Sequence, residues 1–204
     1  MDRDYLTILN GKIFDYEAET HTYKIDGVPV PSITQLLAVK FGHKYDGIPE
    51  GTLQRAADAG TRMHEAIEDY ITEQKEDGSE ELRNFKFLMK QYEMTPVSSE
   101  IPVILYDKGK PFAAGRFDLL LEKDGNYGLG DLKHTATLDK EYLAYQLNLY
   151  KAAYEQTYLY TNHKIEFLVG IHLRGEKRKL VALPINYTLT DEIITEWRKN
   201  NDPE

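Results

Sequence analysis

The pattern of hydrophobic and polar positions in the first half of the chain predicts one hairpin and three helices. Alternation over residues 12–30 predicts a β-hairpin. The spacing that follows predicts a short helix capped by Ser32, a long helix over about residues 51–76 and another over 80–94. The expected inward positions are Phe14, Tyr16, Tyr23 and Ile25; Ile33, Leu36 and Leu37; Leu53, Ala56, Ala57, Gly60, Met63, His64, Ile67 and Ile71; and Leu82, Phe85, Leu88 and Met89.

In the second half of the chain, strands dominate. Residues 97–134 read as three strands joined by the turns "DKGKP" and "EKDGN". A helix capped by Asp139 follows to about residue 160, then two strands around the basic turn "RGEKRK" and a terminal helix. Thr190 is the expected N-cap of that last helix. This order predicts an α/β (α+β) domain with a mixed central sheet flanked by helices.

The chain length and composition set the class of protein. The 204 residues suit one domain, divided into an N-terminal hairpin and short helix (1–50), a core (51–185) and a C-terminal helix (186–204). There is no cysteine, which excludes disulfides, zinc–thiolate sites and iron–sulfur clusters. No apolar run approaches the length of a membrane helix and the polar start does not resemble a signal peptide, so we expect a soluble, cytoplasmic protein.

The net charge of −9 argues against a protein that coats nucleic acid, although basic residues can still grip it locally. Much of the acidic excess lies between Glu65 and Leu82, where a solvated helix face is the ordinary explanation.

Two aspartates and a lysine stand out among residues that otherwise read as buried sheet. Asp131 and Lys133 are two positions apart on one predicted strand, so their side chains leave the same face. Asp118 lies on the preceding strand and comes opposite Asp131 if the register allows. Two carboxylates beside an ammonium can hold a hard divalent cation and leave a charge for water or phosphate. The simpler alternative is polar residues at strand ends.

Two helices carry further candidates. His64 lies on the apolar side of its helix, where a lone histidine is more often a buried structural residue than a ligand. Gln146 and Tyr150 are four positions apart and share one face of the later helix, a spacing that ordinary packing also explains.

These pieces together resemble the PD-(D/E)xK nuclease superfamily, and within it the RecB-type branch that includes many phage-encoded exonucleases. The family pattern is a Gly-x-x-x-His helix, an Asp on one strand, (Asp/Glu)-x-Lys on the next and Gln-x-x-x-Tyr on the following helix. Here the order is "GTRMH", "GRFD", "GDLKH" and "QLNLY". The segment "HTYKIDGVPVPSITQLL" also looks like the N-terminal part of phage members. Each motif alone is weak; four in order are specific.

The resemblance departs from the family in two respects. Phe117 stands where the motif name suggests proline, a variation that the superfamily tolerates, and position 131 is Asp rather than Glu. The absence of cysteine sets the chain apart from members with a four-cysteine cluster, and its length leaves no room for a helicase motor. The resemblance therefore implies a compact, stand-alone nuclease with a restriction-endonuclease-like core.

What the resemblance implies for the residues follows position by position. His64, Asp118, Asp131 and the main-chain carbonyl of Leu132 would hold Mg²⁺ or Mn²⁺. Lys133 would position or deprotonate the attacking water, and Gln146 and Tyr150 would orient it or hold a phosphate. Glu68 is a candidate partner for the His64 ring, although an exposed glutamate is the simpler interpretation. Candidate DNA contacts are Arg62, Arg116, Arg174, Lys177, Arg178 and Lys179, the last four in a turn that reads equally as a solvated loop.

The implied activity is metal-dependent hydrolysis of DNA, most simply as an exonuclease in the cytoplasm of a bacterial host. DNA is the implied partner, and a single-strand-annealing or recombination protein and an oligomer are compatible with the branch. The alternatives are an endonuclease of the same fold, a non-cleaving module that binds DNA or protein, and an unrelated small-molecule-binding α/β protein.

Overall fold

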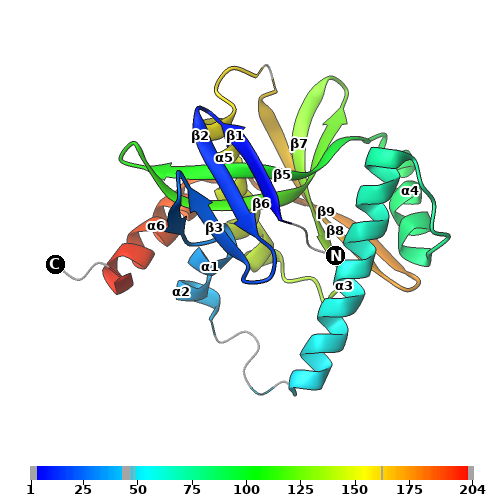
Figure 1. Ribbon diagram of the computed structural model, residues 1–204. Helices are drawn as coiled ribbons and strands as arrows, with labels where there is room; N and C mark the ends of the chain where they lie inside the picture. The colour runs from blue at the N-terminus through cyan, green and yellow to red at the C-terminus, as the bar shows by residue number, and fades with distance from the viewer. Residues whose placement is uncertain (1–3, 43–46, 48, 162, 202–204) are drawn as a thin grey trace.

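A computed structural model describes residues 4–42, 47, 49–161 and 163–201, which form two sheets and six helices (Figure 1). The small sheet holds β1 (Tyr5–Leu9), β2 (Lys12–Glu17), β3 (Thr22–Ile25) and β4 (Val28–Val30). The helices α1 (Ile33–Leu36), α2 (Ala38–Phe41), α3 (Glu50–Glu73) and α4 (Glu80–Tyr92) follow, then β5 (Thr95–Asp107), β6 (Lys110–Lys123) and β7 (Asn126–Lys133). The chain continues through α5 (Lys140–Thr157), β8 (Ile165–Arg174), β9 (Lys177–Leu183) and α6 (Tyr187–Asn201).

The central sheet has the strand order β5-β6-β7-β8-β9 and is mixed. All neighbours are antiparallel except β7 and β8, which run parallel because α5 crosses between them. A parallel pair needs such a crossover, so α5 is placed over one face of the sheet. The sequence-based prediction of a mixed α/β (α+β) sheet flanked by helices is confirmed.

Two hydrophobic cores lie between the sheet and its helices. One joins α1, α5 and α6 to the sheet through residues such as Phe117, Leu120 and Tyr150. The other joins α3 and α4 through residues such as Met63, Phe85 and Leu119. The carboxylates described below lie where β6 passes between these two cores.

The small sheet is fixed to the central sheet by a third core. Phe14, Tyr16 and Ile25 are buried against Ile104 and Ala114 of β5 and β6. The Ala114 N–H also donates to the Pro31 carbonyl at 3.0 Å, just before the capping box in which Ser32 and Gln35 begin α1. The hairpin of β2 and β3 and the Ser32 cap were predicted; the additional strands β1 and β4 were not.

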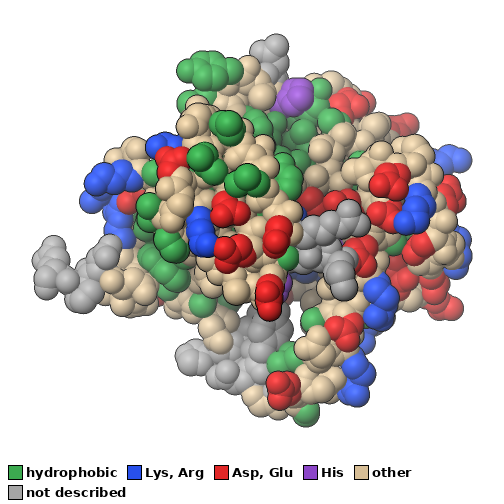
Figure 2. All heavy atoms as spheres, in the orientation of Figure 1, with side chains coloured by type: hydrophobic (Ala, Val, Ile, Leu, Met, Phe, Trp, Pro, Cys, Tyr) green, Lys and Arg blue, Asp and Glu red, His purple; other side chains and the backbone are tan. Residues whose placement is uncertain are grey.

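Figure 2 shows hydrophobic side chains gathered over the small sheet and acidic side chains over the side that carries α4. The first group includes Leu6 and Ile8, which are each 72% exposed and face away from the body of the protein. No described helix is long and apolar enough to cross a membrane.

Two helix predictions need correction. The apolar stripe expected along the long helix is buried only in its second half, at Met63 and Ile67, whereas Ala56 and Ala57 are exposed because that half of α3 extends beyond the sheet (Figure 1). Thr190 does not cap α6. It is buried within the helix, which begins at Tyr187, and the Asn186 side chain accepts a bond from the Thr188 N–H at 3.1 Å.

The ring of Phe117 connects the fold to the site, since it is 1% exposed and packs against Tyr150 and Tyr154 at centroid distances of 6.1 and 5.8 Å. We expect Phe117→Ala to lower the free energy of unfolding by about 3–5 kcal/mol, because the truncation leaves a cavity between strand and helix. Leu6→Ala, at an exposed position, should change it by less than about 0.5 kcal/mol. Urea unfolding followed by circular dichroism measures both, and equal effects would contradict this description of the core.

Candidate metal centre

The strand β6 is irregular at Asp118, and this irregularity forms the site. Leu119 and Leu121 belong to the core under α3 and α4, whereas Phe117 and Leu120 both belong to the core under α5. Residues three apart on a regular strand face opposite sides, so the alternation is interrupted between Phe117 and Leu120. Regular alternation would place Phe117, Leu119 and Leu121 on one face, whereas the structure separates Phe117 from the other two.

The ladder between β6 and β7 ends just before Asp118. Its pairs run from Lys123–Asn126 to Leu119–Gly130, one residue at a time, so the next pair in register is Asp118–Asp131. Beyond the ladder, the Leu132 N–H donates to Asp118 Oδ2 at 2.6 Å. The side chain of Asp118 thus satisfies a main-chain donor of β7 and is held beside Asp131. The register that the sequence required is present.

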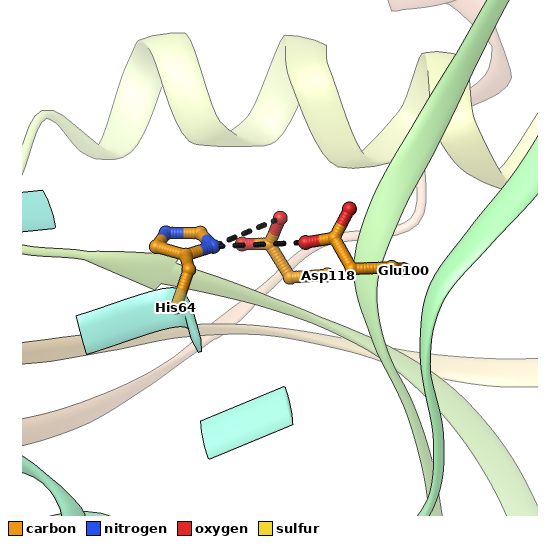
Figure 3. Close-up of side chains that lie close together, drawn as sticks. All are labelled: His64, Glu100 and Asp118. Atoms are coloured by element: carbon orange, nitrogen blue, oxygen red, sulfur yellow. Dashed lines mark ion pairs between the residues drawn. The ribbon is translucent and has the colours of Figure 1, made fainter. Parts of the chain in front are cut away.

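Glu100 is a third carboxylate that sequence reasoning missed. Its neighbours on β5 pair as Ser99–Leu119 and Ile101–Phe117, which places Glu100 opposite Asp118. Glu100 has a φ of +51°, a left-handed conformation inside a strand that costs about 1–2 kcal/mol for a residue with a β-carbon. Its carboxylate lies beside that of Asp118 and faces His64 (Figure 3).

His64 completes a group of three candidate ligands. Its Nδ1 lies 3.7 Å from Asp118 Oδ1 and 3.9 Å from Glu100 Oε1 (Figure 3). The ligand atoms of the three residues all lie within 4.8 Å of one another, and each residue is partly buried. His64 is therefore not a buried structural histidine, which was the simpler interpretation. Its side chain points from α3 toward Asp118 and Glu100, where the second half of the helix packs over the interrupted part of β6.

Asp131 and Lys133 form a second pair beside this group. Asp131 Oδ2 lies 2.6 Å from Lys133 Nζ, and the aspartate side chain is only 3% exposed. The three-residue group contains Asp118 but not Asp131, so the structure adds Glu100 to the expected ligands and places Asp131 in an ion pair with Lys133. Both residues leave the same face of β7, as predicted.

Burial and opposing charges set the protonation of these groups. Burial works against the charged form of His64, but the carboxylates of Asp118 and Glu100 outweigh it and raise the pKa of His64 to about 9. Burial raises the pKa of Asp131 to about 6 although Lys133 opposes this, and it likewise raises the pKa of Asp118. Burial would lower the pKa of Lys133, but Asp131 and Asp118 reverse the direction and raise it. Without an ion, Lys133 is therefore a cation.

The two candidates on α5, Gln146 and Tyr150, lie across the carboxylates from His64 and α3. Tyr150 is buried against Gly115, where an added Cβ would lie 3.0 Å from its ring. Burial raises the pKa of Tyr150 well above its usual value, with Asp118 and Asp131 adding to the effect. Gln146 is 6% exposed, and its Oε1 has no hydrogen-bond partner among the described residues. Leu132 contributes its N–H to Asp118, and its side chain is buried in the α3–α4 core.

Of the six candidate DNA contacts, only Arg116 adjoins the carboxylates. Its Nε lies 3.7 Å from Glu100 Oε2, and its guanidinium lies over the Tyr16 ring at 4.6 Å. Arg62 is exposed on α3, two residues before His64. Arg174, Lys177, Arg178 and Lys179 are exposed around the β8–β9 turn, which is held against α4 by bonds from Asn84 to the Gly175 carbonyl and from the Gly175 N–H to Glu81.

The donor set fits a hard divalent cation. An imidazole nitrogen and carboxylate oxygens from α3, β5 and β6 converge, with Asp131 in register beside them. Oxygen ligands suit Mg²⁺, and Mn²⁺ accepts an imidazole as well. Burial raises the pKa values of Asp118 and Asp131, and a bound cation would instead favour their charged forms.

Comparison with models of protein families finds no match, and no curated protein matches the chain. Among solved structures, one described as "Crystal structure of SSO0001" is 12% identical, with a TM-score of 0.48, over 85% of this chain and 77% of that one.

We expect Mn²⁺ to raise the unfolding temperature of the wild-type protein relative to protein in EDTA, because an ion that binds only the folded state stabilises it. Asp118→Asn should abolish most of this rise and should itself stabilise the metal-free protein, because it removes a charge that burial disfavours. Asp58→Asn, on the exposed part of α3, is the matched control. Differential scanning calorimetry decides; an equal Mn²⁺ effect in all three proteins would contradict the site.

The raised pKa of His64 gives the metal-free protein a pH-dependent stability. Because the folded-state value of about 9 exceeds the usual 6.5, the contribution is complete below about pH 6.5 and is lost as the pH rises through about 9. We expect the free energy of unfolding in EDTA to fall more steeply over this interval in the wild type than in His64→Gln. If urea titrations give the two proteins the same dependence of unfolding free energy on pH, the carboxylates do not raise the pKa of His64.

Proposed function

We propose that this chain is a Mg²⁺- or Mn²⁺-dependent deoxyribonuclease of the PD-(D/E)xK superfamily, RecB-type branch, with a restriction-endonuclease-like core and exonuclease activity. The observation that carries the proposal is the convergence of His64, Asp118 and the Asp131–Lys133 pair from three separate elements. These residues came from three separate short motifs of the sequence. A chance match of motifs gives no reason for their side chains to meet at one point.

The proposed ion would be held by His64, Glu100 and Asp118, with Asp131 as a further carboxylate whose Oδ2 stays paired with Lys133. A bound Mg²⁺ or Mn²⁺ supplies Lewis acidity toward a phosphodiester and a lowered pKa for water. Glu100 would join the Leu132 main-chain carbonyl, which the sequence analysis included, as an additional ligand.

Lys133 is the residue placed to act on the reacting groups. Asp131 holds its ammonium at 2.6 Å, so the position of Nζ is defined before substrate arrives. From there Lys133 orients a water or a phosphate oxygen by donating to it and offsets the charge that develops on the phosphorane. Gln146 offers a buried Oε1 without a partner among the described residues, which is suited to accept a bond from water or from Lys133. Tyr150 lies beside Asp118 and Asp131 as a neutral, buried hydroxyl.

The experiment is the digestion of linear and circular DNA with Mg²⁺ or Mn²⁺. We expect wild-type protein to release nucleotides from linear DNA, and Lys133→Ala to reduce turnover at least about 100-fold while most DNA binding is retained. Lys199→Ala, at the exposed end of α6, is the control for loss of a positive charge.

Each of the other possible results would favour a different explanation. Equal trace activity in wild type and Lys133→Ala would assign the cleavage to a contaminant. Cleavage of closed circular DNA would favour an endonuclease, and DNA binding without any metal-dependent cleavage would favour a non-cleaving module.

A further inference from the structure

A cavity of about 430 Å³ lies directly beside the candidate metal centre. Its boundary includes residues of β1, α3, β5 and β6, among them Thr7, Glu68, Ser99 and Arg116. Glu100 belongs to both places, since it lines the cavity and also faces His64 and Asp118. The volume is within the range of small-molecule sites, roughly 300–1,000 Å³.

Two elements, α3 and β6, each contribute one residue to the metal centre and another to the cavity. On α3, His64 faces the carboxylates, and Glu68, one turn later, lines the cavity. On β6, Asp118 belongs to the metal centre and Arg116, two residues earlier, lines the cavity. A ligand that bridges the two places needs only the length of one small molecule, because a single residue, Glu100, separates them.

The chemistry of the cavity favours an uncharged, planar ligand with hydrogen-bonding edges. Two carboxylates and one guanidinium, from Glu68, Glu100 and Arg116, give its boundary a net negative charge, which disfavours a second phosphate. Tyr5 and Tyr158 add aromatic surface, and base stacking on such rings tolerates any base. Thr7 and Ser99 supply hydroxyls that can donate or accept.

Ser99 lines the cavity and carries a hydroxyl that no described residue satisfies. Its Oγ is buried and has no hydrogen-bond partner among the described residues. A buried hydroxyl left without a partner is unfavourable unless another group reaches it. It lies next to Glu100, the residue held in the left-handed conformation, so the same distortion of β5 that forms the metal centre shapes the cavity.

We propose that this cavity holds the nucleobase of the nucleotide whose phosphate lies at the metal centre. The inference rests on the proposed nuclease function and adds a base-binding subsite to it. One nucleotide would then place its phosphate against the cation and its base between β1 and β5, where Glu68 accepts from an exocyclic amino group and the hydroxyls of Thr7 and Ser99 bond the ring edges.

The test compares two ligands that differ only in the base. Calorimetric titration with Mn²⁺ present should give about tenfold tighter binding for deoxyadenosine 5′-monophosphate than for 2-deoxyribose 5-phosphate. Thr7→Phe fills the cavity from β1 and should remove this difference. Leu6→Phe places the same ring on the opposite, exposed face of β1 and should preserve it. Binding of Mn²⁺ alone should be equal in all three proteins.

The outcomes separate the two proposals. If the wild type degrades linear DNA but binds both ligands equally, the base subsite is wrong and the nuclease stands. If the base strengthens binding and Thr7→Phe removes the effect, yet no DNA is cleaved, the subsite stands and the nuclease is wrong. If the protein neither cleaves DNA nor binds either ligand, both are wrong.

Discussion

The placement of the Asp118 carboxylate inside an interrupted strand is the constraint on which the rest of the site depends. The regular ladder between β6 and β7 ends before Asp118, and the Asp118 carboxylate instead accepts a hydrogen bond from the Leu132 N–H of the neighbouring strand. That bond fixes β7 beside it, so Asp131 and Lys133 leave β7 in register with Asp118. Because a buried carboxylate is unfavourable without compensation, His64 and Lys133 lie within its field as counter-charges.

The same interruption connects distant parts of the chain. Glu100 takes a strained conformation opposite Asp118 and forms an ion pair with Arg116, whose guanidinium lies on Tyr16 of the small sheet. The N-terminal strands therefore help to shape the site, although no motif residue lies on them. Strain of this kind is kept only where the surrounding packing determines it, and it concentrates at functional sites.

Much of the site could be predicted because it follows from strand periodicity. The turn at Asp124-Gly125 sets the register that brings Asp118 opposite Asp131, and both features are visible in the sequence. Glu100 could not be found in this way. The turn before β6 pairs Asp107 with Lys110, a register that would place Glu100 opposite Phe117. An irregularity between Leu105 and Tyr106 shifts the register by one residue, which exchanges the two faces of the strand. No residue pattern marks such a shift. The helices show the same limit: the stripe of α3 gives its periodicity but not where the sheet beneath it ends.

The central claim is that these side chains hold one divalent cation. The most direct measurement is anomalous diffraction from crystals of the protein soaked in Mn²⁺. We predict a peak bounded by His64 Nδ1 and the carboxylates of Asp118 and Glu100, and the loss of that peak in Asp118→Asn. A well-ordered site without a peak, or a peak elsewhere on the protein with this group still paired as in the metal-free state, would contradict it.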